Sequence, residues 1–129
     1  MKAGTYYIGD LCYCMHEEWG EVCSLIFNRQ SGKEQWGEFT LEDGRYIAVL
    51  PTAHGDGAYR DQYGNQYCVD AGLIGCIRVE DIDPSEDSAY WGKLGAIHTF
   101  TEDFEVKDIR GILYFGHIQI DTSLGWDCD

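Results

Sequence analysis

The fold is decided between residues 54 and 77, where the chain reads HGDGAYRDQYGNQYCVDAGLIGCI. This stretch holds five glycines, three aspartates and three tyrosines. Glycines at such density mark tight turns or places where the backbone approaches another group closely. Residues 57–61 and 66–70 flank the turn-forming residues 62–65, and residues 73–79 form an apolar run. The pattern predicts a β-hairpin followed by a core strand.

Short segments with a two-residue period continue on both sides of this stretch. Residues 35–41 and 45–50 flank an Asp43-Gly44 pair, which is typical of a hairpin turn. Residues 112–121 predict either a strand buried on both faces over its first half or a hairpin bent at Gly116. Further strands are expected at 5–14, with a break near Gly9-Asp10, and at 94–100 and 104–106.

One amphipathic helix is expected near the N-terminus, from His16 to Asn28. Apolar residues recur there with the helical period and form one stripe. They are Met15, Trp19, Val22, Cys23 and Ile26. The whole pattern predicts a single domain over residues 1–129 that is mainly β (α+β). We expect an antiparallel sandwich or partly closed barrel of about eight short strands with one N-terminal amphipathic helix.

The chain is strongly acidic, with 9 Lys and Arg against 23 Asp and Glu and a net charge of −14. This charge repels nucleic-acid phosphates and anionic membrane surfaces, so we expect no direct nucleic-acid binding and no membrane binding. Twelve acids and three bases lie in residues 80–129, which carry −9 of the −14. The acidity is explained either by solubility alone or by a basic partner. The acids expected to contact such a partner are Glu80, Asp81, Asp83, Glu86, Asp87, Glu102, Asp103 and Asp108.

The sequence shows no segment that would direct the chain into or across a membrane, and this bears on the state of its cysteines. No window approaches the roughly 18 apolar residues of a membrane-spanning helix, and the first residues lack the apolar core of a signal peptide. We therefore expect a cytoplasmic protein. Six cysteines would suit disulfides in a small secreted protein, but this compartment and the apolar neighbours favour free, mostly buried thiols.

A metal site is the first chemical hypothesis, because Cys12, Cys14 and His16 alternate along the chain. On an extended strand these side chains would share one face and could reach one ion. Structural zinc sites usually combine two pairs of ligands with wider spacing. We therefore favour a purely structural role for the three residues and expect no metal and no cofactor.

A pocket formed by residues 54–70 is the second hypothesis. Its candidate residues are His54, Asp56, Tyr59, Asp61, Tyr67 and Asp70. They would form a small-ligand site, or an acid/base site in which an aspartate works with His54. The competing interpretation is that Asp56 and Asp61 bond nearby backbone amides in turns. Asp70 interrupts an apolar stretch, and a buried carboxylate there would need partners.

Motifs that mark catalysis or phosphate binding are missing from the sequence. It contains no G-x-S-x-G nucleophile element and no G-x-x-x-x-G-K-[ST] or G-x-G-x-x-G loop. With six cysteines and four histidines, a Cys–His pair arises readily by coincidence. We therefore name no catalytic residue and expect a protein that is not an enzyme.

Two motifs carry a resemblance to known proteins. The first is GTYYIGDLCY at residues 4–13, and the second comprises GDGAY at 55–59 and YCVDAGLIG at 67–75. Together they resemble small, functionally uncharacterised proteins of tailed bacteriophages and prophages. They are similar, more distantly, to bacterial domains of unknown function with a G-D-P-C-Y element and a V-D-[AS]-G element. Leu11 occupies the proline position of the first element. The resemblance implies an accessory protein acting in the cytoplasm of an infected bacterium.

These observations favour a small acidic phage accessory protein that binds and inhibits a host factor, such as a defence component, without catalysis. The contact would be a basic or nucleic-acid-binding surface of the host protein. One alternative is a binding protein for a small ligand such as a nucleotide signal. Another is a virion or scaffold component.

Overall fold

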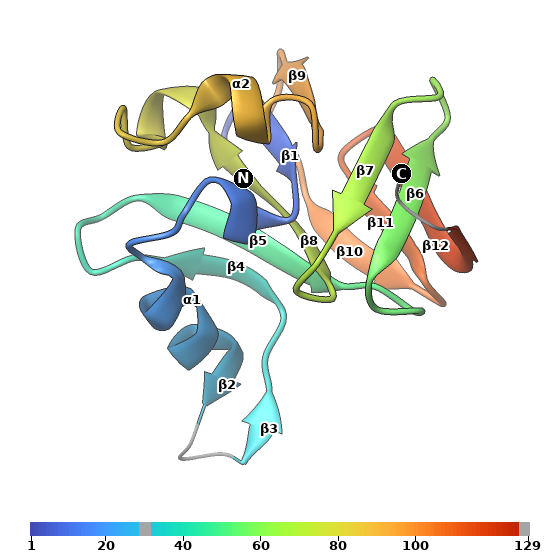
Figure 1. Cartoon of the computed structure of the whole chain (residues 1–129), viewed down its shortest axis with the longest axis horizontal. Coiled ribbons are helices and arrows are strands. Elements are labelled where there is room, and N and C mark those ends of the chain that lie inside the picture. Colours follow the sequence, from blue (N-terminus) through green and yellow to red (C-terminus); the bar gives the residue numbers. More distant parts are fainter. Residues whose placement is uncertain (29–31, 127–129) are drawn as a thin grey trace.

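The computed structural model describes residues 1–28 and 32–126 and contains two five-stranded antiparallel sheets (Figure 1). Sheet I has the order β4 (Gly37–Thr40), β5 (Tyr46–Pro51), β8 (Leu73–Arg78), β1 (Gly4–Gly9) and β9 (Ala96–Phe100). Sheet II has the order β10 (Val106–Ile109), β11 (Ile112–Phe115), β12 (Ile118–Trp126), β6 (Gly57–Asp61) and β7 (Gln66–Val69). A separate ribbon pairs β2 (Phe27–Asn28) with β3 (Lys33–Glu34). The predicted mainly β, antiparallel sandwich is confirmed.

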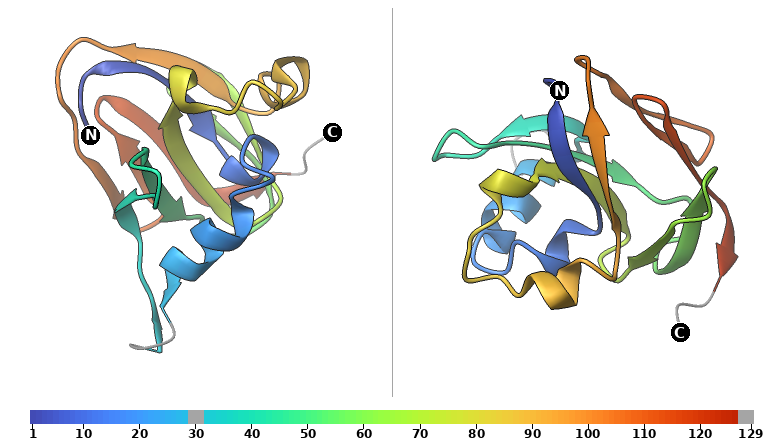
Figure 2. Two further views of the ribbon diagram at one scale, coloured as in Figure 1. Left: turned by 90° about the vertical axis from the view of Figure 1, so that its left-hand side faces the viewer. Right: turned by 90° about the horizontal axis from the view of Figure 1, so that it is seen from above.

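Sheet I lies between sheet II and a layer of short helical segments (Figures 1 and 2). That layer consists of α1 (Trp19–Ile26), α2 (Ser88–Trp91) and 3₁₀ turns at Leu11–Tyr13 and Val79–Asp81. One core, which includes Tyr6, Ile74 and Phe115, fills the space between the sheets. A second core, which includes Ile47 and Trp91, packs the other face of sheet I against the helical layer. Strands β5 and β8 are therefore covered on both faces, which explains why their sequences are almost continuously apolar.

The predicted hairpins are confirmed. Strands β6 and β7 pair with Tyr59 opposite Tyr67, and β4 and β5 pair across the Asp43-Gly44 turn. Between 112 and 121 the hairpin alternative is correct, because β11 and β12 pair on either side of Gly116. Gly116 has a φ of 59°, a left-handed conformation that glycine adopts without strain.

Several element boundaries differ from the predictions. The helix is shorter than 16–28, since α1 begins at Trp19 and ends at Ile26. The opening strand ends at Gly9, and the chain then turns instead of continuing extended to residue 14. The strand expected at 104–106 is displaced to β10. Helix α2 was not predicted, because four residues are too few to show a helical period.

The cysteines agree only in part with the expectation of free thiols. Cys12, Cys14, Cys23 and Cys76 are free, and burial raises the pKa of the Cys76 thiol to about 12. Cys68 is disulfide-bonded, so the prediction is wrong at this position. Cys128 lies outside the described residues. Neither helix within these residues is long and apolar enough to cross a membrane.

The two sheets meet at one corner, where the edge strands β9 and β7 approach each other. The backbone N–H of Cys68 donates to the carbonyl oxygen of Leu94 at 3.0 Å. The Tyr67 hydroxyl of β7 lies 2.9 Å from Nε2 of His98 in β9. Both contacts bring residues of the predicted hairpin against a strand that follows some thirty positions later.

Candidate functional site

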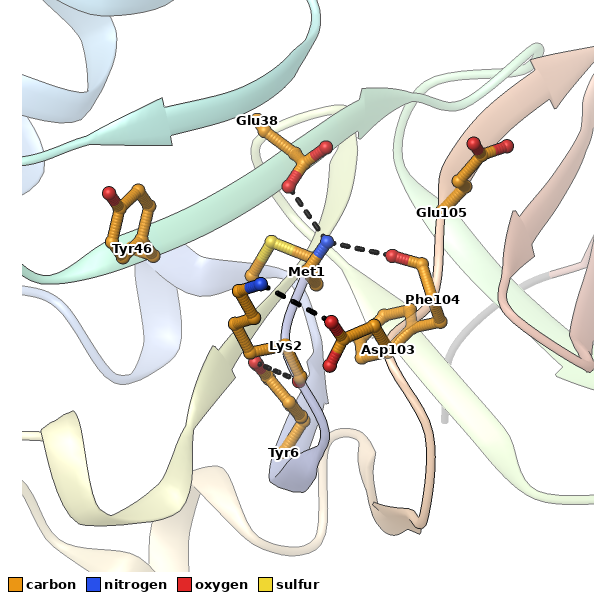
Figure 3. A pocket seen from close by; sticks show the side chains of 8 residues that line it. All are labelled: Met1, Lys2, Tyr6, Glu38, Tyr46, Asp103, Phe104 and Glu105. Carbon is orange, nitrogen blue, oxygen red and sulfur yellow. Dashed lines mark hydrogen bonds and ion pairs between the residues drawn. The ribbon is translucent and has the colours of Figure 1, made fainter.

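A hollow on the described surface lies beside the first residues of the chain (Figure 3). Its volume is about 640 Å³, within the range of typical ligand pockets. Its walls come from the start of the chain, from β4 and β5 of sheet I, and from the loop before β10. They are formed by Met1, Lys2, Tyr6, Glu38, Tyr46, Asp103, Phe104 and Glu105. We call this cavity the N-terminal hollow. A smaller hollow of about 310 Å³ shares Asp103 and Phe104 with it.

The cationic groups of the N-terminal hollow are already paired. The Met1 amino group donates to Oε1 of Glu38 at 2.8 Å and to the carbonyl oxygen of Phe104 at 2.7 Å. Lys2 Nζ lies 3.3 Å from Oδ2 of Asp103. The backbone N–H of Ala3 donates to the other oxygen of Asp103 at 2.9 Å. The hydrogen bond from Ala3, with that from Lys2, lowers the pKa of Asp103, so this carboxylate is ionised at neutral pH.

Aromatic rings supply the apolar part of the same wall. The Tyr6 ring is buried and packs edge-on against Phe104, with centroids 5.1 Å apart. Its hydroxyl donates to the carbonyl oxygen of Lys2 at 2.7 Å. The Tyr46 side chain is 59% exposed. Tyr46 and Glu105 lie on opposite sides of the Met1 amino group in Figure 3, and neither side chain forms a hydrogen bond or ion pair with another described residue.

Of the residues predicted to form a pocket between 54 and 70, the structure brings Asp61 and Tyr67 together by a direct hydrogen bond. The buried Tyr67 hydroxyl donates to Oδ2 of Asp61 at 2.6 Å. The Asp61 carboxylate also accepts the backbone N–H groups of Tyr63 and Asn65 and the Asn65 side-chain amide. Burial acts to raise the pKa of Asp61, but these hydrogen bonds outweigh it and keep the pKa below its usual value. The turn role foreseen for Asp61 is thus correct.

His98 completes this group and was missed by the sequence analysis. Its Nε2 faces the Tyr67 hydroxyl at 2.9 Å and Oδ2 of Asp61 at 3.5 Å. Since Tyr67 donates its proton to Asp61, His98 Nε2 must donate to the Tyr67 oxygen. Burial lowers the pKa of His98, although the charge of Asp61 opposes the shift. His98 alternates with Ala96 and Phe100 on the inner face of β9, a pattern visible in the sequence.

The other residues of the predicted pocket do not converge with Asp61. Asp56 and Asp70 are exposed at the open end of the β6–β7 hairpin, whereas Asp61 lies at its turn end. His54 is exposed and its Nε2 lies 2.6 Å from the Ser123 carbonyl oxygen. The buried Tyr59 hydroxyl donates to the Gly55 carbonyl oxygen at 2.8 Å. The acid/base set of His54 with an aspartate is therefore not assembled.

The buried carboxylate of this region is Asp10, not Asp70. Asp10 Oδ2 accepts the backbone N–H groups of Asp70 at 2.8 Å and Ala71 at 2.6 Å. Its Oδ1 accepts the N–H of Cys12 at 3.0 Å. Burial raises the pKa of Asp10, and the three N–H donors oppose the rise. The first resemblance motif thus contacts the second through this side chain.

The Cys12, Cys14 and His16 side chains do not share one face. The chain turns at Leu11–Tyr13, Cys14 is buried and His16 is exposed, with its ring 2.6 Å from Glu86. The expected extended geometry is therefore wrong. Among residues 1–28 and 32–126, no group of three or more His, Cys, Asp or Glu side chains is placed to bind a metal ion.

The eight acids expected to contact a partner fall into three groups. Five accept backbone N–H groups and so stabilise turns, caps or loops: Asp83, Glu86, Asp87, Asp103 and Asp108. Glu80 forms an exposed ion pair with Arg78 at 3.4 Å. Asp81 and Glu102 side chains make no hydrogen bond or ion pair with any described residue.

Arg78 and Ala3 connect two of these acids, Glu80 and Asp103. Its Nη1 contacts Glu80, and its Nη2 donates to the carbonyl oxygen of Ala3 at 3.0 Å. Ala3 in turn donates its N–H to Asp103. Glu80 therefore lies close to the N-terminal hollow, whereas Asp108 belongs to strand β10 of sheet II.

Compared with known proteins, the chain matches no protein-family model, no curated protein and no solved structure.

Proposed function

We propose that the protein is a small acidic binding protein that captures a basic surface of another protein and performs no catalysis. In keeping with the phage-like motifs, we propose a host factor of an infected bacterium, such as a defence component, as the partner and the bacterial cytoplasm as the compartment. The net charge of −14 is the observation that carries the proposal. An excess of this size accelerates encounter with basic surfaces through long-range attraction.

The distribution of ion pairs supports this proposal. Arg45 and Arg78 are bound to neighbouring carboxylates, and Lys2 is bound to Asp103. The side chains of Asp81 and Glu102 form no ion pair or hydrogen bond with any described residue, so their charge is uncompensated. Glu102 is exposed and Asp81 is half-buried.

The buried Asp61–Tyr67–His98 group favours structure over catalysis. Its polar atoms are directed at one another and join sheet II to sheet I. Asp61 is fully buried and His98 is only 13% exposed, so little of the group is open to a substrate. We therefore assign its role to the sandwich and not to a reaction.

The test is capture of a partner from bacterial lysate on the immobilised protein, at about 0.05 M and about 0.5 M salt. We expect a partner at low salt that is largely released at high salt. The variant Glu80→Gln/Asp81→Asn/Glu102→Gln should capture less of it. The matched control, Glu17→Gln/Glu42→Gln/Asp56→Asn, also changes the charge from −14 to −11 but alters exposed acids elsewhere. Equal capture by the two variants, or capture that is insensitive to salt, would contradict the proposal.

A further inference from the structure

We infer that the N-terminal hollow binds an arginine side chain of the captured partner. The inference rests on the proposed function and names the group that the hollow recognises. It combines two properties of the hollow: its size and the charge left over among its walls.

The size of the hollow admits a long side chain. Its volume of about 640 Å³ is larger than a single side chain requires, so a protruding residue could enter together with part of its own backbone. Tyr6 and Phe104 are buried and fixed by packing against each other, so this wall is formed before any partner arrives. Preformed walls reduce the entropy that is lost on binding.

The charge that remains free in the hollow is negative. The Met1 amino group is bound to Glu38 and the Lys2 ammonium to Asp103. Glu105 is exposed and has no such partner among the residues described. Glu38 uses only Oε1 for Met1, which leaves its second oxygen as an acceptor. A cation therefore meets one unpaired carboxylate and one spare carboxylate oxygen, whereas an anion meets repulsion.

The chemistry of the walls selects arginine over lysine. A guanidinium group has a planar fork of N–H donors that pairs with carboxylates in two-bond geometry. Glu105 supplies an unpaired carboxylate, and Glu38 supplies an oxygen that Met1 does not use. A lysine ammonium is a point charge with a stronger hydration shell and uses this geometry less well.

The test is an NMR titration of the whole protein with capped Gly-Arg-Gly, using capped Gly-Lys-Gly and capped Gly-Glu-Gly as comparison peptides. We expect the arginine peptide to shift the signals of Glu38 and Glu105 and to bind about 3- to 10-fold more tightly than the lysine peptide. Glu105→Gln should weaken it about 3-fold or more. Its control is Glu17→Gln, which removes an exposed acid elsewhere.

Equal binding of the arginine and lysine peptides would overturn the inference, and so would equal weakening by the control variant. The partner experiment separates this inference from the proposed function. If lysate capture succeeds and Glu105→Gln does not reduce it, the hollow is not the contact and the acidic binding function stands. If the arginine peptide binds as expected and no partner is captured at low salt, the site stands and the proposed function fails.

Discussion

The carboxylate of Asp10 accepts the backbone N–H of Ala71 at 2.6 Å and joins segments that are 61 positions apart. Asp10 belongs to the GDLCY motif and Ala71 to the VDAG motif. The two motifs that characterise the sequence are therefore one structural unit, in which a buried side chain of the first satisfies backbone donors of the second. The conformation of the loop after β7 depends on this carboxylate.

Replacing Asp10 should destabilise the protein in a graded way. Asp10→Ala leaves three N–H groups without acceptors, and we expect a loss of about 2–4 kcal/mol in the free energy of unfolding. Asp10→Asn keeps one acceptor oxygen but turns an amide donor toward at least one N–H, so about 1–2 kcal/mol should be lost. Urea unfolding measures both. Asp70→Asn is the control, since the Asp70 side chain is exposed, and a loss equal to that of Asp10→Asn would contradict the assignment.

Tyr67→Phe should also destabilise the protein, because the Tyr67 hydroxyl lies between Asp61 and His98. Its removal leaves the N–H of His98 without its acceptor, while Asp61 keeps its other donors. We expect a loss of about 1–3 kcal/mol in unfolding free energy. Tyr63→Phe removes a hydroxyl from an exposed ring and should change stability by less than about 0.5 kcal/mol. If the two variants lose the same amount, the hydroxyl does not join the sheets.

The pH dependence of stability should contain a contribution from His98. Its pKa is lowered in the folded protein, so the unfolded chain binds a proton at a higher pH than the folded chain does. Stability is therefore complete above the unfolded pKa of about 6.5 and decreases as the pH falls from there toward the folded value. The slope for one proton is at most about 1.4 kcal/mol per pH unit. Asp61, whose pKa is also lowered, contributes stability that is lost only in more acidic solution.

Unfolding measured between about pH 8 and pH 5 for the wild type and His98→Gln checks this contribution. The difference in stability between the two proteins should shrink as the pH falls, since only the wild type carries the titrating group. His54→Gln is the control, because His54 is an exposed histidine that is not among the groups shifting the pKa of His98. A difference that is independent of pH would show that His98 does not titrate differently on folding.

Local patterns predicted the fold better than they predicted the site. The hairpin of β6 and β7 depends on neighbouring residues and a turn, so alternation and glycine placement were sufficient to find it. The roles of His98 and Asp10 depend on partners that are 31 and 61 positions away, and no local pattern fixes such distances. The Ala96, His98 and Phe100 alternation was the available signal for His98. For Asp10, the break in an apolar strand was visible but its three N–H donors were not.

Alanine in place of Gly75 in β8 and of Gly20 in α1 should change the stability of the protein in opposite directions. In Gly75→Ala the new Cβ would collide with the Ala48 carbonyl oxygen of the neighbouring strand and lie 2.9 Å from Cδ1 of Leu11. A backbone atom in a central strand cannot move aside cheaply, so we expect a loss of at least about 2 kcal/mol. In Gly20→Ala the Cβ meets no atom within 4 Å, and alanine favours the helix, so a gain of about 0.5–1 kcal/mol is expected. Thermal unfolding of the two variants measures both effects, and a Gly75→Ala protein as stable as the wild type would show that β5 and β8 are not packed this closely.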